Sequence, residues 1–500
     1  MRRAVWMAVA VALVSAAAFA AGDDDPYLWL ADIHGEKALA WVKAQDAKSD
    51  AALKSDPTYA ADFAAIKSSL DTKDRIALGQ LDHGRIVNFW QDANHVRGLW
   101  RRATMAEYRK PDPHWDVLLD VDKLDAEQNK DWVFQGGRCT ASDKRCLVRL
   151  SPGGGDASEV REFDPGKHQF VAGGFTLPAA KSSAAYVDDN TILFATDFGS
   201  GTMTKSSYPR IMKIWHRGQP ISAAKQVFEV GPDDIAVRPI VLHGPGGITN
   251  AKATVLIERG VSFFENEYSF MAANGKLTKL PLPLGADLQG AIKGNLIFKL
   301  RHAWDANGTT YKEGSLIMFP LREFLNTHRM PKIALLAAPD AHSMVDTVAT
   351  GRDAVYAAIY RDVTGSIHAF RPGKHGWSDS VLDLPKGGST TVVSADDWGS
   401  RALFTYESFL VPATLYEYDG HGEPRAIKSQ PPLFDASDMV SEQFWVSSSD
   451  GVKVPYFLIH KKGHAHDVPT ILYGYGGFEL SLTPWSGTTD TARSTPDRSG

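Results

Sequence analysis

The chain has 500 residues, 43% of them hydrophobic and 10% aromatic, so it can build large cores and is not a disordered protein. At this length two or three domains are expected. The formal net charge of −5 argues against a nucleic-acid-binding protein, which would usually be basic.

The first 20 residues have the pattern of a secretory signal peptide. Arg2 and Arg3 provide the positive start, residues 4–19 are apolar, and Ala18-Phe-Ala20 fits the small-residue cleavage rule. An uncleaved membrane anchor is the alternative, but the run is short for a bilayer span. No later stretch is apolar enough to cross a membrane, so we expect an exported protein, periplasmic or secreted, that is free of the membrane after cleavage near Ala20.

Residues 21–74 show a helical pattern. Leu39, Trp41, Val42, Leu53, Phe63, Ile66 and Leu70 recur at helical spacing with Lys and Asp between them. Asp56-Pro57 predicts a break between two helices, because the residue before a proline disfavours the helical conformation. We expect these helices to form a cap that packs on a larger body.

Residues 75–434 form a long β-rich region. Short runs of β-branched and aromatic residues alternate with turn-forming Gly, Asp, Asn and Pro. Its length suits a β-propeller with blades of about 40–50 residues and four strands each, which gives seven blades by length alone. The expected strands include residues 85–90, 146–150, 191–195, 296–300, 316–319, 354–360 and 401–405.

Cys139 and Cys146 are the two cysteines of the chain, and six residues lie between them. In an oxidising compartment such a pair can close a hairpin, so we expect a disulfide; two unpaired thiols are the alternative. Two cysteines alone supply too few ligands for a metal site.

Residues 435–486 resemble the beginning of a new sheet. Residues 442–447 and 452–460 flank Ser448-Ser-Asp-Gly451, which predicts a β-hairpin. The run Ile471-Leu-Tyr473 predicts a buried third strand that ends in the glycine loop Gly474-Tyr-Gly-Gly477, where α/β enzymes place their chemistry. Residues 487–500 form a polar tail without apolar periodicity.

Several separated motifs resemble the prolyl oligopeptidase family of serine peptidases. The final motif is specific, and the resemblance covers residues 23 to about 485. The motifs are Asp25-Pro-Tyr-Leu-Trp-Leu30, Gly35-Glu-Lys-Ala-Leu-Ala-Trp41, Gly173-Gly-Phe-Thr-Leu-Pro-Ala-Ala-Lys-Ser182, Thr196-Asp-Phe-Gly199, Tyr208-Pro-Arg-Ile211, Ser408-Phe-Leu-Val-Pro-Ala-Thr-Leu-Tyr416, Asp450-Gly-Val-Lys-Val-Pro455 and Leu472-Tyr-Gly-Tyr-Gly-Gly-Phe478.

The resemblance implies a mainly β fold, a seven-bladed propeller inserted in an α/β-hydrolase domain that is made from both chain ends. It implies a monomeric endopeptidase for short peptides, typically cut after proline, without a cofactor or metal. Tyr473 matches the tyrosine whose hydroxyl helps form the oxyanion hole, a role that suits a phenol held at a strand end. A packing tyrosine beside a glycine turn is the alternative reading of Tyr473.

The sequence departs from this family at the catalytic triad. No serine has glycine at both −2 and +2, and no histidine follows Tyr473, where the family's Ser, Asp and His are expected. The hydrolase domain is therefore truncated in this chain, by a frameshift or at a fragment end, and we predict no peptidase activity as written. The alternative function is a non-catalytic propeller that binds a peptide or protein partner.

Other possible sites are weaker. Asp197-Phe-Gly199 and Gly153-Gly-Gly155 read as turns. His464, His466 and Asp467 lie on a lysine-rich loop and are expected to be solvated rather than metal-bound. The acids Glu265, Glu267, Asp396 and Asp397 could suit a propeller glycosidase, but we expect unpaired, exposed loop acids.

Overall fold

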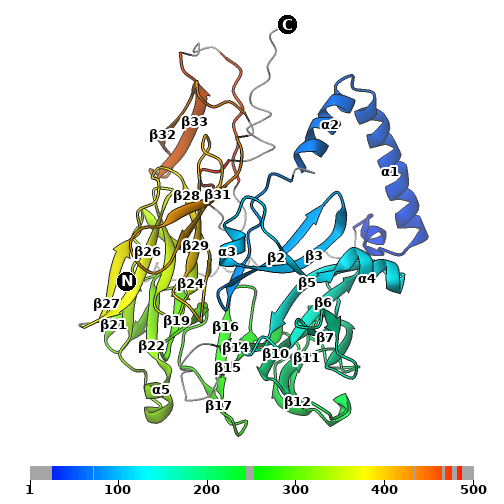
Figure 1. Ribbon diagram of the computed structural model, residues 1–500, viewed down its shortest axis with the longest axis vertical. Coiled ribbons are helices and arrows are strands. Elements are labelled where there is room, and N and C mark those ends of the chain that lie inside the picture. The colour runs from blue at the N-terminus through cyan, green and yellow to red at the C-terminus, as the bar shows by residue number, and fades with distance from the viewer. Residues whose placement is uncertain are drawn as a thin grey trace, which may run out of the picture. The chain divides into compact units, whose positions relative to one another are not determined.

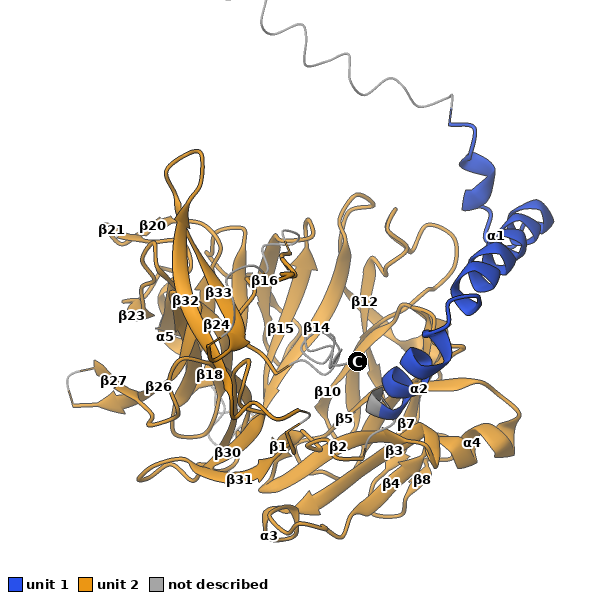
Figure 2. Ribbon diagram, turned by 90° about the horizontal axis from the view of Figure 1, so that it is seen from above, with its two compact units in different colours: residues 1–71 blue, residues 72–500 orange. Residues whose placement is uncertain are grey.

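The computed structural model describes residues 25–70, 73–243, 253–374, 376–432, 434–463, 468–475 and 481–486. The chain separates into two compact units, residues 1–71 and residues 72–500 (Figure 2). The expected signal peptide, residues 1–20, and the expected polar tail, residues 487–500, lie outside the described residues. In the described ranges, no helix combines the length and apolar character that crossing a bilayer requires.

The first unit is helical, as the periodicity predicts. It contains the 3₁₀ helix η1 (Leu28–Ala31) and the helices α1 (Glu36–Lys54) and α2 (Tyr59–Leu70), with the expected break at Asp56-Pro57. Acidic Glu36 lies in the first turn of α1 and basic Lys54 in its last, which complements the helix dipole. The apolar side chains of these helices remain largely exposed; Phe63 is 56% accessible.

The second unit is a seven-bladed β-propeller, which confirms the predicted fold class and blade count. The sheets of the seven blades surround a common centre (Figures 1 and 2), and the antiparallel strands of each blade follow one another in chain order. The first three blades are β1 (Gln80–Asp82), β2 (Arg85–Asp92), β3 (His95–Thr104) and β4 (Asp116–Asp120); β5 (Trp132–Cys139), β6 (Cys146–Pro152), β7 (Ser158–Asp164) and β8 (Gln169–Phe170), with β9 (Thr176–Ala180) also on β7; and β10 (Ser183–Asp188), β11 (Thr191–Ala195), β12 (Ile211–His216) and β13 (Lys225–Glu229).

The remaining four blades repeat the same order. They are β14 (Ala236–His243), β15 (Ala253–Gly260), β16 (Asn266–Met271) and β17 (Leu277–Lys279); β18 (Ala286–Ile292), β19 (Asn295–Leu300), β22 (Leu316–Pro320) and β23 (Ala334–Ala337); β24 (Ser343–Thr350), β25 (Val355–Arg361), β26 (Thr364–Gly373) and β27 (Gly376–Val381); and β28 (Ser389–Ala395), β29 (Ala402–Glu407), β30 (Thr414–Tyr418) and β31 (Arg425–Ser429).

Short elements fill the connections between these strands. The hairpin β20 (Trp304–Ala306) and β21 (Thr309–Tyr311) lies within the fifth blade. The short helices are α3 (Met105–Tyr108), α4 (Val121–Gln128), η2 (Ile221–Ala223) and α5 (Leu321–Thr327).

The hydrophobic core is divided among the blade interfaces. The described residues form seven buried clusters, each made by two neighbouring blades, and the last joins blade seven to blade one. In β11, Ile192 and Phe194 pack towards blade two, whereas Leu193 and Ala195 pack towards blade four. Because both faces of β11 are covered, its residues 192–195 are continuously apolar rather than alternating.

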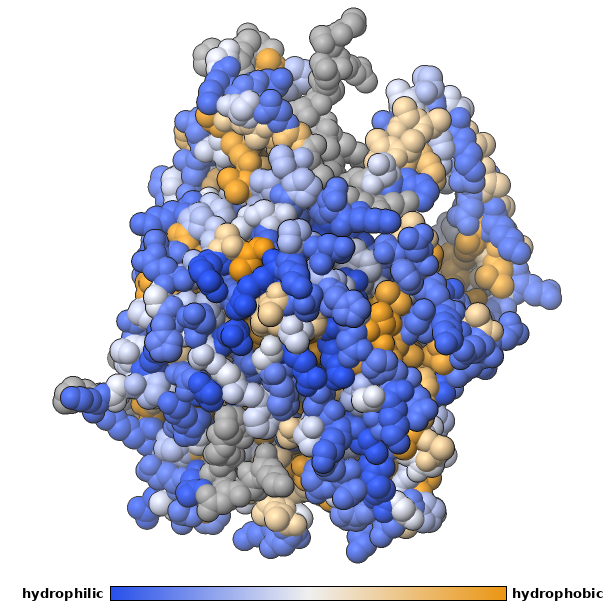
Figure 3. All heavy atoms as spheres, viewed as in Figure 1, coloured by the Kyte–Doolittle hydropathy of each residue, from blue (hydrophilic) through white to orange (hydrophobic). Residues whose placement is uncertain are grey.

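A two-stranded hairpin follows the propeller, as predicted. Strands β32 (Met439–Ser447) and β33 (Lys453–Lys461) pair antiparallel over their whole length. Figure 3 shows apolar surface over this hairpin, near the top of the view, on a face that is otherwise mostly hydrophilic. The exposed side chains there include Phe444, Val446, Val454 and Tyr456.

Candidate functional site

The segment that carries Tyr473 is irregular, so the predicted buried strand at residues 471–473 is wrong. Ile471 is 73% accessible, Leu472 97% and Tyr473 61%. An apolar run becomes a buried strand only where a neighbouring strand pairs with it and an apolar layer covers it. Within the described ranges, neither is present around this segment.

Tyr473 therefore lies in an exposed, irregular stretch of chain. A side chain built on the neighbouring Gly474 would meet no atom within 4 Å, so the backbone here is accessible from solvent. Gly476, Gly477 and Phe478, the rest of the predicted glycine loop, lie outside the described residues. The oxyanion role of Tyr473 stays a prediction.

The hairpin before this segment contacts the propeller at blades six and seven. The ring of Phe457 on β33 lies 5.1 Å from that of Phe409, which follows β29. The side-chain amide of Gln443 on β32 donates to the carbonyl oxygen of Asp362 at 2.8 Å, in the turn between β25 and β26. These contacts join the hairpin to the loop after β29 and to the turn between β25 and β26.

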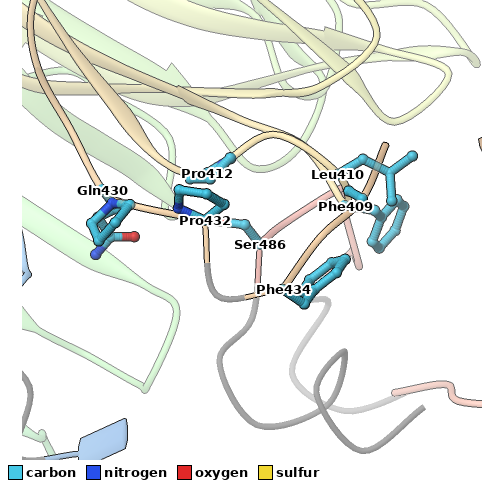
Figure 4. A pocket seen from close by; sticks show the side chains of 9 residues that line it. Phe409, Leu410, Pro412, Gln430, Pro432, Phe434 and Ser486 are labelled. Atoms are coloured by element: carbon cyan, nitrogen blue, oxygen red, sulfur yellow. The ribbon is translucent and has the colours of Figure 1, made fainter. Parts of the chain in front are cut away.

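The described segment Ser481–Ser486 reaches the same end of the propeller. Ser486 lines an apolar pocket together with residues that follow β29 and β31 (Figure 4). The other lining residues are Phe409, Leu410, Pro412, Gln430, Pro431, Pro432, Phe434 and Ala436. The pocket offers rings and proline faces but no titratable group, so it suits packing rather than chemistry.

Cys139 and Cys146 are joined by a disulfide in the structure. They lie opposite each other in the register of β5 and β6, so the bond closes this hairpin. With Asp143 they form the one group of metal-type donors found among the described residues. Both sulfurs are bonded to each other and the Asp143 carboxylate pairs with Arg85 and Arg102, so these residues fit a metal poorly.

Two buried glutamates hold neighbouring parts of the propeller together, and the sequence analysis missed both. Glu162 on β7 accepts two hydrogen bonds from Arg217, at 2.6 and 2.8 Å, and one from the hydroxyl of Tyr186 at 2.7 Å. Burial alone would raise the pKa of Glu162, but the hydrogen bonds from Arg217 and Tyr186 outweigh burial and lower it. Glu417 on β30 is the second, and Arg109 is its main partner.

The expectation of unpaired, exposed loop acids is wrong for three residues. Glu265 is half-buried, and its carboxylate accepts a hydrogen bond from the hydroxyl of Ser262 at 3.0 Å. Asp396 is buried, and its carboxylate accepts hydrogen bonds from the backbone N–H groups of Gly84 at 2.9 Å and Trp398 at 2.9 Å. Glu267 pairs with Arg259 at 3.1 Å and with Lys279 at 2.5 Å. These three carboxylates are engaged in fixing loops and neighbouring strands, which does not suit a catalytic acid pair.

The other weak signals have structural roles or lie outside the described residues. Asp197 accepts from the backbone N–H of Gly199 at 2.7 Å, so Asp197-Phe-Gly199 is a turn, as predicted. Residues 153–155 lie between β6 and β7, as expected of a hairpin loop. His464, His466 and Asp467 are not among the described residues.

Comparison with known proteins identifies the family of this fold. Residues 18–431 match the domain described as "Prolyl oligopeptidase, N-terminal beta-propeller domain". The chain belongs to the prolyl oligopeptidase family. The seven blades are thus the propeller domain of this family.

The relatives are peptidases by name. The chain is 38% identical over 469 residues to an uncharacterised peptidase of Sinorhizobium fredii, covering 92% of this chain and 64% of that protein. It is 30% identical over 473 residues to an uncharacterised peptidase of Rickettsia prowazekii, covering 91% of this chain and 65% of that protein. The chain therefore spans less than two thirds of the length of these relatives.

A solved structure shows the same architecture. The "Post-proline cleaving enzyme from Rickettsia typhi" matches with a TM-score of 0.85 and 30% identity, covering 92% of this chain and 68% of that one. The match extends through the propeller to most of the described chain. Prolyl oligopeptidase relatives thus share the propeller and the hairpin region with this protein.

Proposed function

We propose that this chain is the propeller-bearing part of an exported serine endopeptidase that acts on short peptides and cleaves after proline. Family membership over residues 18–431 is the observation that carries the proposal. The name of the Rickettsia typhi relative supports the preference for proline. In this proposal the ring of blades admits short peptides and excludes folded proteins.

In this proposal Tyr473 contributes to the oxyanion hole. Attack of the nucleophilic serine on the scissile carbonyl places negative charge on the carbonyl oxygen, and the phenolic O–H of Tyr473 donates a hydrogen bond to it. A histidine takes the proton of the serine and later gives it to the leaving amine, while an aspartate orients the histidine. None of the serines in the 500 residues sits in a G-x-S-x-G elbow, so the chain as given is proposed to be inactive alone.

Two measurements test this proposal. The purified 500-residue chain is incubated with a fluorogenic proline-containing peptide and with a serine-directed phosphonate. We expect neither hydrolysis nor labelling, and either one would overturn the proposed inactivity.

Sequencing the encoding DNA from the codon for Trp485 onward is expected to reveal, in one frame, a G-x-S-x-G elbow followed by Asp and His. A gene without these elements would overturn the proposed peptidase.

A second candidate is a non-catalytic propeller that binds a peptide or a protein partner. Its support is that all seven blades and their interfaces are complete by Ser429 in β31. Limited proteolysis distinguishes it. A stable core that ends near Phe434 favours an independent propeller, whereas cooperative digestion of the whole chain counts against it.

A further inference from the structure

The segment Ser481–Ser486 is held by the propeller through its main chain. It begins eight positions after Tyr473 in the sequence and contacts blade seven. Pro484 is buried, whereas Ser481 and Leu482 are exposed. The contact is therefore local, and it involves the last few described residues rather than the whole segment.

Two side chains of blade seven make the polar contacts. The hydroxyl of Ser389 donates to the carbonyl oxygen of Pro484. The carboxylate of Glu407 accepts from the backbone N–H of Ser486 at 3.0 Å and from its hydroxyl at 2.9 Å. Donor and acceptor thus engage main-chain groups two residues apart, which is how an extended peptide is bound rather than a single side chain.

The positions of these two side chains are fixed by the sheet. Ser389 begins β28 and Glu407 ends β29, and the two residues are direct partners in the antiparallel register. Tyr360 on β25 of blade six holds the same end of β28, because its hydroxyl donates to the carbonyl oxygen of Thr390 at 3.0 Å and accepts from the N–H of Thr390 at 3.1 Å. Ser389 and Glu407 are therefore presented together by strands whose ends are already immobilised.

The approach of the two strands also requires glycine. A side chain at Gly388, just before β28, would collide with the carbonyl oxygen of Glu407 and with the ring of Tyr406. The glycine lets the start of β28 pass close to the end of β29. This close approach places the Ser389 hydroxyl and the Glu407 carboxylate against the same short stretch of chain, residues 484–486.

We propose that Ser389 and Glu407 are positioning residues that clamp the main chain of residues 484–486 and so restrict where Tyr473 can lie relative to the propeller. This inference rests on the proposed role of Tyr473 in the oxyanion hole. Thr483 follows Tyr473 by ten positions, a length that spans at most about 35 Å when fully extended. Fixing one end of this stretch limits the positions open to Tyr473, and the fixed backbone angle of Pro484 lowers the entropy lost on clamping.

Hydrogen exchange of the 500-residue chain tests the clamp directly. In the variant Glu407→Ala we expect the Ser486 amide to exchange at least tenfold faster, because it loses its acceptor. The amides of β28 and β29 should keep their protection, which shows that blade seven remains folded. Glu423→Ala, an exposed glutamate of the same blade, is the matched control and should leave Ser486 unchanged.

Two further variants test the clamp even if Glu407→Ala disturbs the blade. Glu407→Gln retains a side-chain oxygen as acceptor and should restore part of the protection. Ser486→Ala alters only the clamped segment, removes its hydroxyl, and should raise exchange of the segment by a smaller factor. Unchanged exchange at Ser486 in both Glu407→Ala and Ser486→Ala would overturn the clamp.

A distance measurement tests the positioning role. A contact that only stabilised blade seven would leave the spread of distances between Tyr473 and the propeller unchanged. Spin labels on cysteines introduced by Tyr475→Cys and His421→Cys report the distance from residue 475, two positions after Tyr473, to residue 421 in blade seven. We expect a broader distance distribution with Glu407→Ala than with Glu423→Ala; equal widths would overturn positioning. Neither test requires catalysis, so a failed clamp and a failed peptidase proposal are distinguished.

Discussion

Arg109 of the first blade donates two hydrogen bonds to Glu417 of the last blade, from Nε to Oε2 at 2.7 Å and from Nη2 to Oε1 at 2.5 Å. The Glu417 side chain is 0% accessible, whereas that of Arg109 is 35% accessible. The pKa of Arg109 is raised, chiefly by its hydrogen bonds to Glu417. Among the described residues no strand is shared between the first and last blades. This pair, the apolar cluster around Leu403 and the hydrogen bond from the Gly84 N–H to Asp396 are among the contacts that close the ring.

The first prediction concerns this closing pair. Arg109→Ala should lower the free energy of unfolding by about 2–3 kcal/mol, because it leaves a buried carboxylate with weaker partners. Arg425→Ala is the control: Arg425 lies 3.6 Å from the same carboxylate but is 64% accessible. It should cost less than about 0.5 kcal/mol. Urea titration followed by circular dichroism measures both, and equal losses would contradict the assignment of Arg109 as the closing partner.

The second prediction concerns stability in acid. Burial alone would raise the pKa of Asp92, but hydrogen bonds from Trp90, Asn94 and His95 lower it to about 2 from the model-compound value of 3.8. Because the folded-state pKa is the lower one, the stabilisation is present above pH 3.8 and is lost as the pH falls towards 2. The side chain is 12% accessible, so about 2 kcal/mol is expected.

Asp92→Asn tests this prediction. The difference in unfolding free energy between wild type and variant should be about 2 kcal/mol at pH 7 and should shrink as the pH falls from 4 to about 2. Asp112→Asn, at an exposed position, is the control and should show little pH-dependent difference. A difference that stays constant across this pH range would show that Asp92 acts through packing instead of charge.

The sequence predicted the propeller well because its second strands are buried on both faces. The runs at residues 192–195 and 402–404 are apolar throughout, and each lies in the second strand of a blade. The outer strands are less distinctive; β31 is Arg-Ala-Ile-Lys-Ser, with mixed polarity and partial exposure. The blade count could therefore be inferred from length but not from a repeat.

The elements that could not be predicted depend on contacts between distant residues. Arg109 and Glu417 are 308 positions apart, and Glu162 and Arg217 are 55 apart, so each carboxylate looks like an ordinary surface charge in the sequence. The Ile471-Leu-Tyr473 run fails for a related reason, since its burial requires neighbours that the described chain does not place there. A single strand's composition indicates what it could pair with, not whether the partner is present.

The third prediction concerns the disulfide. The double variant Cys139→Ala/Cys146→Ala should lower the free energy of unfolding by about 2 kcal/mol, because the bond closes a short loop and restricts the unfolded chain. The denatured, unreduced wild-type chain should contain no thiol that reacts with Ellman's reagent. Two reactive thiols would contradict the bond, and thiol-reduced wild type should match the double variant in stability.

The last prediction concerns the exposed face of the β32–β33 hairpin. Phe444 lies opposite Tyr456 and Val446 opposite Val454, so these four side chains share one face of the hairpin. Their accessible fractions range from 38% to 52%. A contiguous apolar face of this kind binds hydrophobic dyes and invites association between molecules.

Replacing the valine pair of that face should reduce both properties without unfolding the protein. Val446→Lys with Val454→Glu places opposite charges across the two strands, which is a favourable cross-strand pair. We expect the fluorescence of the bound dye anilinonaphthalene sulfonate to fall by about half, with a stability change within about 0.5 kcal/mol. Val96→Lys is the control, since Val96 is 65% accessible but lies in the first blade. If Val96→Lys lowers dye binding as much as the double variant does, the hairpin is not the principal apolar surface of this chain.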